Sequence, residues 1–188
     1  IYGTAAALVF GTLFFPTVDP VVGMIVALLT YAVGFFARPF GGALFGHLGD
    51  KYGRKSVLMS TMLLMGFSTF AIGLLPTYEQ VGLLAPVLLV TLRILQGIGF
   101  GGEWGGAALM ILESCPKEKR GLYSSFIQVG FPLGLLLASG IFSLLSSLPK
   151  EDFMSWGWRI PFLISIVLVA IGSYVRSKLS ETPVFDEL

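Results

Sequence analysis

The chain has 188 residues, of which 55% are hydrophobic and 12% are charged, and its mean hydropathy is +0.85. A soluble core of this length does not bury so many apolar side chains, so the composition indicates a membrane protein. The net charge of +1 gives no sign of a nucleic-acid partner, and the single cysteine, Cys115, excludes an internal disulfide framework.

Six apolar segments follow one another along the chain. About 20 residues are enough to cross a hydrocarbon core of about 30 Å, so each segment is interpreted as a membrane span. The expected bounds are 1–16, 21–48, 56–76, 82–114, 121–148 and 157–176. The chain begins with Ile1 inside the first span, which is expected to be the remainder of a truncated helix. Because the breaks are short, neighbouring helices should be antiparallel, and residues 1–188 should form one six-helix transmembrane bundle.

Lysine and arginine residues gather at one membrane face in this arrangement. The other face receives Lys150, with Arg159 near its edge. The positive-inside rule makes the richer face cytoplasmic and puts both ends of the chain in the cytoplasm. Trp156 and Trp158, at the outer start of the last span, are expected to be anchors at the membrane interface. The cations of the richer face are Lys51, Arg54, Lys55, Lys117, Lys119, Arg120, Arg176 and Lys178.

The turn between the second and third spans, residues 46–55, is the most polar window in the first half of the chain. Gly53 is expected to turn the backbone with a positive φ. Asp50 is expected to accept hydrogen bonds from an exposed helix N-terminus, either that of the helix starting near Ser56 or another. An ordinary basic loop would explain the cations but not the spacing of aspartate and glycine. The positions that define the pattern are Gly46, Asp50, Lys51, Gly53, Arg54 and Lys55.

Three ionisable residues, Arg38, Arg93 and Glu103, lie well inside apolar spans. Each would cost about 2.5–3.5 kcal/mol in lipid, so each is expected to face the bundle interior, a partner or water. In the fourth span, Arg93, Gln96 and Glu103 fall within about 120° of one helix face. The candidates for substrate binding and proton coupling are Arg38, Arg93, Gln96 and Glu103. Glycines recur every fourth residue in the same span, at 97, 101 and 105 and at 102 and 106, and predict close packing against another helix.

The pattern at 46–55 resembles the G-x-x-x-D-(R/K)-x-G-R-(R/K) signature of the major facilitator superfamily of secondary transporters, and Arg93, Gln96 and Gly97 resemble its R-x-x-Q-G pattern. Residues 37–42, 101–106 and 180–185 are similar to motifs of the metabolite:proton symporter subfamily. The resemblance implies an all-α membrane fold in which these six helices are the N-terminal bundle of twelve. A C-terminal six-helix half would then be the partner that the given chain lacks.

The same resemblance implies transport of a small organic acid or zwitterion, such as shikimate, a di- or tricarboxylate, proline or betaine, coupled to protons by alternating access in the bacterial inner membrane. The arginine corresponding to Arg93 usually works with an acid on the first helix, and the first span as given contains none. Arg93 therefore has two interpretations, one in which it binds substrate or tunes an acid and one in which it only ties helices together. Uniport, antiport and a sensor or scaffold without flux are the alternative functions.

Two pairings of charges follow as hypotheses. Arg38 and Glu103 should sit at similar depth, and they could form an interhelical ion pair with either a gating or a static role. Glu113 could join Arg54 or Arg120 in a cytoplasmic charge cluster. The sequence contains no G-x-x-x-x-G-K-(S/T) motif, paired metal ligands or nucleophile triad, so the chain is not expected to be an enzyme or to need a cofactor, and the proton gradient is the expected energy source.

Overall fold

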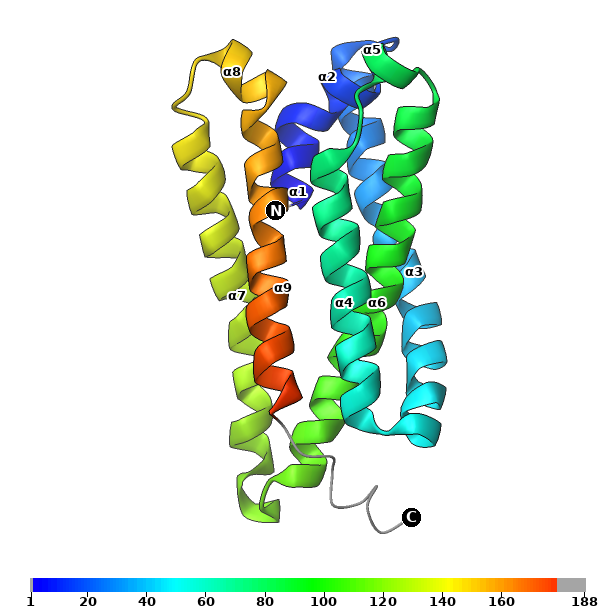
Figure 1. The fold of residues 1–188 in the computed structure, drawn as a ribbon, viewed down its shortest axis with the longest axis vertical. Coiled ribbons are helices and arrows are strands. Elements are labelled where there is room, and N and C mark those ends of the chain that lie inside the picture. Colours follow the sequence, from blue (N-terminus) through cyan, green and yellow to red (C-terminus); the bar gives the residue numbers. More distant parts are fainter. Residues whose placement is uncertain (1, 179–188) are drawn as a thin grey trace.

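The computed structural model describes residues 2–178, which form a bundle of helices (Figure 1). Five helical stretches in this range are long and apolar enough to cross a membrane, and a shorter apolar stretch covers Gly3–Phe14. The expected all-α membrane fold is confirmed, and the chain is an integral membrane protein. The expected motif at 180–185 lies outside the described residues. The five long helices are α3 (Pro20–Tyr52), α4 (Arg54–Leu74), α6 (Leu84–Ser114), α7 (Arg120–Leu145) and α9 (Ile160–Ser177).

The first segment is divided into α1 (Tyr2–Ala5), the π-helical turn η1 (Ala6–Phe10) and α2 (Gly11–Phe14). Phe10 and Phe14 are fully buried, and their rings pack edge to face with each other at 5.3 Å. Trp158 joins them, with its ring 5.7 Å from Phe10. The expectation that Trp158 anchors the chain at the membrane interface is therefore wrong, because this side chain is completely enclosed in an aromatic core. Trp156, in contrast, is half exposed.

Four short elements occupy stretches that the sequence left as breaks or as parts of longer spans. They are α5 (Tyr78–Val81), η2 (Lys117–Lys119), α8 (Lys150–Ser155) and η3 (Gly157–Arg159). The backbone amide of Thr77 donates to the side-chain oxygen of Gln80 at the start of α5 (3.2 Å), a local contact that stabilises a helix start. Figure 1 places α2, α5 and α8 at one end of the bundle and the connections between α3 and α4 and between α6 and α7 at the other.

Helix α3 begins and ends where local chemistry favours a helix boundary. The carboxylate of Asp19 accepts a hydrogen bond from the amide of Val21 (2.9 Å), and Pro20 fills the first helical position. At the other end Gly53 has φ 93° and separates α3 from α4, which confirms the predicted turn. Asp50 does not cap α4. Its carboxylate instead lies 2.7 Å from the guanidinium of Arg54, one turn further along the chain.

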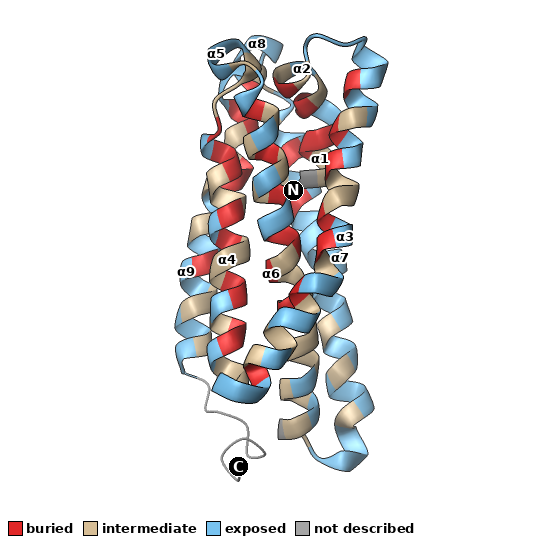
Figure 2. Cartoon of the chain, turned by 90° about the vertical axis from the view of Figure 1, so that its right-hand side faces the viewer, coloured by how far each residue is buried: buried red, intermediate tan, exposed pale blue. Residues whose placement is uncertain are grey.

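Burial is uneven across the bundle. Buried positions run along α4 and α6, whereas α7 is exposed over most of its surface (Figure 2). In α7, Ala138 and Phe142 are the buried residues, both in the half near α8. The apolar side chains on the remainder of α7 are therefore left for lipid or another protein surface to cover.

Candidate functional site

Helices α3 and α6 approach at backbone distance, and this contact sets the direction of every candidate side chain on them. A Cβ added to Gly41 would overlap the carbonyl group of Ile98, and one added to Gly101 would overlap that of Arg38. Gly97 lies in the same way against the carbonyl oxygen of Gly34. Small residues permit such close approach in membrane helices. The predicted glycine packing is confirmed at 97 and 101, whereas an added Cβ at Gly105 would meet nothing within 4 Å.

Arg93 and Gln96 form the first polar group of the site, and both are buried. The guanidinium of Arg93 donates to the side-chain oxygen of Gln96 and lies 4.7 Å from the ring centroid of Tyr31 on α3. Gln96 in turn donates to the hydroxyl of Thr69 on α4 (2.5 Å), which donates to the carbonyl oxygen of Met65 (2.7 Å). A chain of donors thus crosses from α6 to α4 inside the bundle.

Thr69 and Tyr31 were not predicted from the sequence as site residues. They lie on helices other than the one that carries Arg93, and neither has a charge or a motif that distinguishes it. Buried polar groups need partners, however, so the predicted burial of Arg93 and Gln96 required acceptors from some neighbouring helix. Only the packing of α3 and α4 against α6 decides which side chains supply them.

Arg38 lies in the half of α3 that leads to the turn at 46–55, and aromatic rings hold it. Its guanidinium carbon is 3.8 Å from the centroid of Phe35 and 4.0 Å from that of Phe100, distances that give favourable cation–π contacts. The ion pair hypothesised between Arg38 and Glu103 is not formed. Gly101 faces α3, and Glu103 follows it by two residues, about 200° around the helix, so its side chain turns away from α3.

Glu103 pairs with a residue that sequence reasoning had counted only as a cytoplasmic cation. Its Oε1 lies 2.5 Å from Nη2 of Arg176, in the last turn of α9. Nη1 of the same guanidinium donates to the backbone carbonyl oxygen of Leu58 on α4 (2.5 Å). Arg176 therefore joins α9, α6 and α4 through one side chain. Pairing neutralises two charges within helical segments that would otherwise be costly to bury.

A cavity of about 990 Å³ opens between α3, α6 and α7 and contains both charges that were expected to pair. Arg38 enters it from α3 and Glu103 from α6, while Gln128 is the polar side chain from α7. The rest of its wall is apolar or small, with Phe35, Pro39, Gly42, Met65, Phe100, Gly101, Trp104, Gly105, Ala107, Ile127, Gly130 and Phe131. A mainly apolar wall with few polar groups of opposite charge is typical of small-molecule sites.

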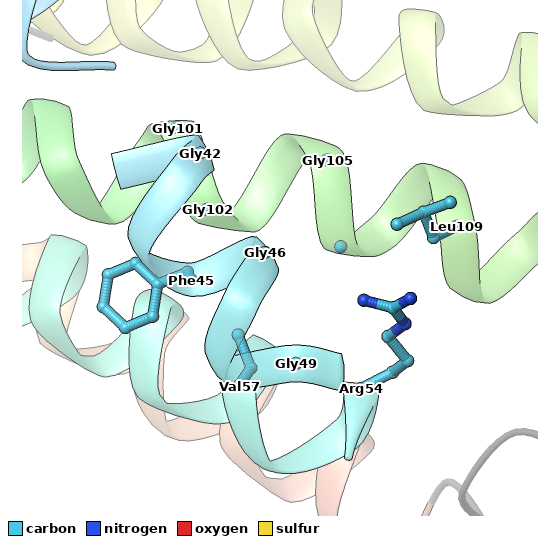
Figure 3. Close-up of a pocket in the computed structure, with 11 residues that line it drawn as sticks. Gly42, Phe45, Gly46, Gly49, Arg54, Val57, Gly101, Gly102, Gly105 and Leu109 are labelled. Atoms are coloured by element: carbon cyan, nitrogen blue, oxygen red, sulfur yellow. The ribbon is translucent and has the colours of Figure 1, made fainter. Parts of the chain in front are cut away.

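The turn at 46–55 lies beside a second, smaller cavity of about 100 Å³. Figure 3 shows the guanidinium of Arg54 pointing from the turn toward Leu109 on α6. Nε of Arg54 is 3.7 Å from Oε1 of Glu113, so the predicted cluster forms between these two residues. Arg120, the other predicted partner, does not join it within the described part of the chain, where its buried Nε has no hydrogen-bond acceptor. At the end of α9, Lys55 donates to the carbonyl oxygen of Ser177 (3.1 Å).

The remaining predicted positions of the turn line this cavity or face outward. Gly46 contributes to the cavity wall together with Gly42 and Gly49. Lys51 is exposed and lies 5.3 Å from the ring centroid of Tyr52. Among the residues that the structure describes, no group of three or more histidine, cysteine or acidic side chains is placed to hold a metal ion.

Comparison with known proteins shows what this arrangement is similar to. The family model described as "Sugar (and other) transporter" matches residues 3–186. "Inner membrane metabolite transport protein YhjE" from Escherichia coli K12 is 54% identical over 189 residues, covering 100% of this chain and 43% of the relative. The "Shikimate transporter" of the same organism is 53% identical over 188 residues, with the same coverage. Its "Proline/betaine transporter" is 45% identical and is covered over 37% of its length.

The chain therefore spans less than half the length of these relatives. Among solved structures, the inward-open xylose transporter XylE from E. coli matches with a TM-score of 0.80 at 20% identity, covering 100% of this chain and 47% of that one. A partially occluded form of XylE matches with a TM-score of 0.81 at 22% identity. At this identity the likeness shows the fold alone. It corresponds to the N-terminal half of a major facilitator fold, as predicted.

Proposed function

Because the chain belongs to the sugar (and other) transporter family of the major facilitator superfamily, we propose that the full-length protein carries a small organic acid or zwitterion across the bacterial inner membrane. It does so by alternating access, coupled to the entry of protons. Relatives named for shikimate and for proline and betaine, 53% and 45% identical, support this range of substrates. The family and these relatives are transporters and not enzymes.

The observation that carries the proposal is the buried Arg93–Gln96–Thr69 chain. A guanidinium and an amide inside a membrane bundle cost free energy and are retained where they bind a ligand, an ion or each other. Arg93 is held in place by Gln96 and by the ring of Tyr31. A guanidinium held in this way is ready to pair with a carboxylate, from the substrate or from another part of the full-length protein. Arg38 and Glu103 add one charge of each sign to the cavity wall.

Orientation and partners are further parts of the proposed function. The end of the bundle that carries the α3–α4 and α6–α7 connections faces the cytoplasm in this proposal, because most of the lysines and arginines lie there. The C-terminal half of the full-length protein covers the exposed face of this bundle. Protons supply the energy, and no cofactor or nucleic acid takes part.

The test is uptake of labelled shikimate, 2-oxoglutarate, citrate, proline and glycine betaine by the full-length protein in proteoliposomes, with and without an inward proton gradient. We expect accumulation of one compound only with the gradient, and loss of that accumulation in Arg93→Ala. Thr91→Ala is the matched control, since Thr91 lies on the same helix with its side chain exposed.

Two results would contradict the proposed function, and each would favour a different alternative. Equal uptake with and without the gradient would assign a uniporter. Binding of a compound without any flux would assign a sensor or scaffold.

A further inference from the structure

Arg176 fastens the end of α9 to two other helices. Its Nη2 lies 2.5 Å from Oε1 of Glu103 on α6, and its Nη1 donates to the carbonyl oxygen of Leu58 on α4 at 2.5 Å. The two charged side chains are each only about one-fifth exposed, at 20% and 19%. Charge-assisted contacts in such an enclosed place are stronger than those at a surface. The charge of the Glu103 carboxylate therefore decides how firmly α9 is held against α6.

The second oxygen of Glu103 has no such partner. Within the described part of the chain, Oε2 is buried and accepts no hydrogen bond, although Glu103 belongs to the wall of the large cavity. A buried carboxylate oxygen without a donor is costly, and such an atom in a native structure calls for an explanation. A proton that binds at this oxygen would remove the cost of keeping a negative charge there without a donor.

We propose that Glu103 binds a proton during the transport cycle and that Arg176 is its positioning residue. This inference rests on the proposed function of proton-coupled transport. A proton from cavity water adds to Oε2 and leaves a neutral carboxylic acid, so the attraction between Glu103 and Arg176 is lost. Arg176 remains charged and keeps its contact with the carbonyl oxygen of Leu58. The link between α6 and α9 opens, while that between α4 and α9 stays.

The charges around Glu103 couple this step to an anionic group of the substrate. Arg38 on α3 lines the same cavity, and its described contacts are with two aromatic rings and no carboxylate. On α9 the facing cation is Arg176. The cations of α4 are engaged elsewhere, Arg54 by Asp50 and Glu113 and Lys55 by the carbonyl oxygen of Ser177. The residues of α7 that line the cavity carry no ionisable group.

A substrate carboxylate bound at Arg38 adds a negative charge to the cavity, and a proton bound at Glu103 removes one. Each event therefore favours the other, which is the sign of coupling that a symporter requires. The substrate class that follows is a compound with at least one carboxylate.

The first experiment compares two modes of transport by the full-length protein in proteoliposomes, using the compound that the wild type accumulates. Gradient-driven accumulation requires net proton movement, whereas exchange of internal for external substrate does not. We expect Glu103→Gln to keep exchange and to lose accumulation. Arg176→Lys should retain part of the accumulation, because an ammonium group still pairs with Glu103. Glu79→Gln is the matched control, since Glu79 is exposed on α5.

A merely structural role would lower exchange and accumulation together, and this result would overturn the inference. So would normal accumulation by Glu103→Gln. Gradient-independent uptake by the wild type would instead overturn the proposed function, so the two failures are distinguishable.

The second experiment does not depend on transport. Spin labels at Leu112 on α6 and Val175 on α9, both exposed, report the distance between these helices in the full-length protein with its native cysteines, Cys115 included, replaced by serine. We expect a second, broader distance population as the pH falls in the wild type, and the same population at every pH in Glu103→Gln. Distances that are unchanged by pH in the wild type and identical in the variant would overturn the inference even if uptake proves proton-dependent.

Discussion

Gly41 on α3 lies directly against the carbonyl group of Ile98 on α6, with no room for a side chain between them. Backbone atoms form this contact, so neither side can yield by a rotamer change. The contact fixes the rotation of α6 about its own axis, and with it the directions in which Arg93, Gln96 and Glu103 point.

We expect Gly41→Ala to lower the stability of the purified full-length protein by on the order of 1–3 kcal/mol, the usual cost of overpacking. The matched control is Gly105→Ala, because a Cβ at Gly105 would meet nothing within 4 Å. Alanine is the better helix former by about 1 kcal/mol, so the control should be neutral or stabilising. Thermal unfolding in detergent measures both changes. Equal effects of the two substitutions would show that α3 and α6 do not pack as described.

Thr69→Val should break the polar chain at its last side chain. Valine has nearly the same shape but offers no oxygen to the amide of Gln96, and a buried donor without an acceptor costs about 1–3 kcal/mol. Thr91→Val is the control, since the hydroxyl of Thr91 is exposed and bonds only within its own helix. The two melting temperatures should differ, with that of Thr69→Val lower. A pair of equal values would mean that Gln96 finds another acceptor.

Arg159 joins the start of α9 to the end of α4, although its position in the sequence suggested no more than a cation near the membrane edge. Its Nη1 donates to the carbonyl oxygens of Gly73 (2.9 Å) and Leu75 (2.8 Å) at the C-terminus of α4. Arg159→Ala removes a charged donor from these carbonyls and is expected to cost about 1.5–3 kcal/mol. Lys178→Ala, at an exposed residue at the end of α9, should change the melting temperature little. A comparable loss in both variants would contradict the capping role.

Trp158 carries an indole N–H that is buried without an acceptor in the described structure. Trp158→Phe should therefore be mild, because it removes an unsatisfied donor while keeping a ring beside Phe10 and Phe162. Trp158→Ala empties the aromatic core and should cost about 3–5 kcal/mol. Thermal unfolding separates the two, with Trp156→Ala as the control for loss of a half-exposed indole. A phenylalanine variant as unstable as the alanine variant would mean that the N–H has a partner.

The amino-acid sequence by itself determined the class, the long helices and the family of this protein. Long apolar runs separated by proline, glycine and charged residues have one stable outcome in lipid, because a helix satisfies its own backbone hydrogen bonds. The turn at Gly53 could be predicted for a similar local reason, since few residues other than glycine adopt its φ of 93°. The burial of Arg93 and Gln96 was also predictable, because charged and polar groups avoid lipid.

The tertiary structure alone decided which side chains meet. Arg38 and Glu103 had similar depth and opposite charge, yet Glu103 pairs with Arg176, 73 positions along the chain. Depth follows from counting residues along a helix, but direction depends on the rotation of each helix. That rotation is set here by glycines pressed against the backbone of a neighbour. The same contacts bring Thr69 to Gln96 and enclose Trp158 among rings from the first and last helices, so the site is the product of packing between helices that no local pattern specifies.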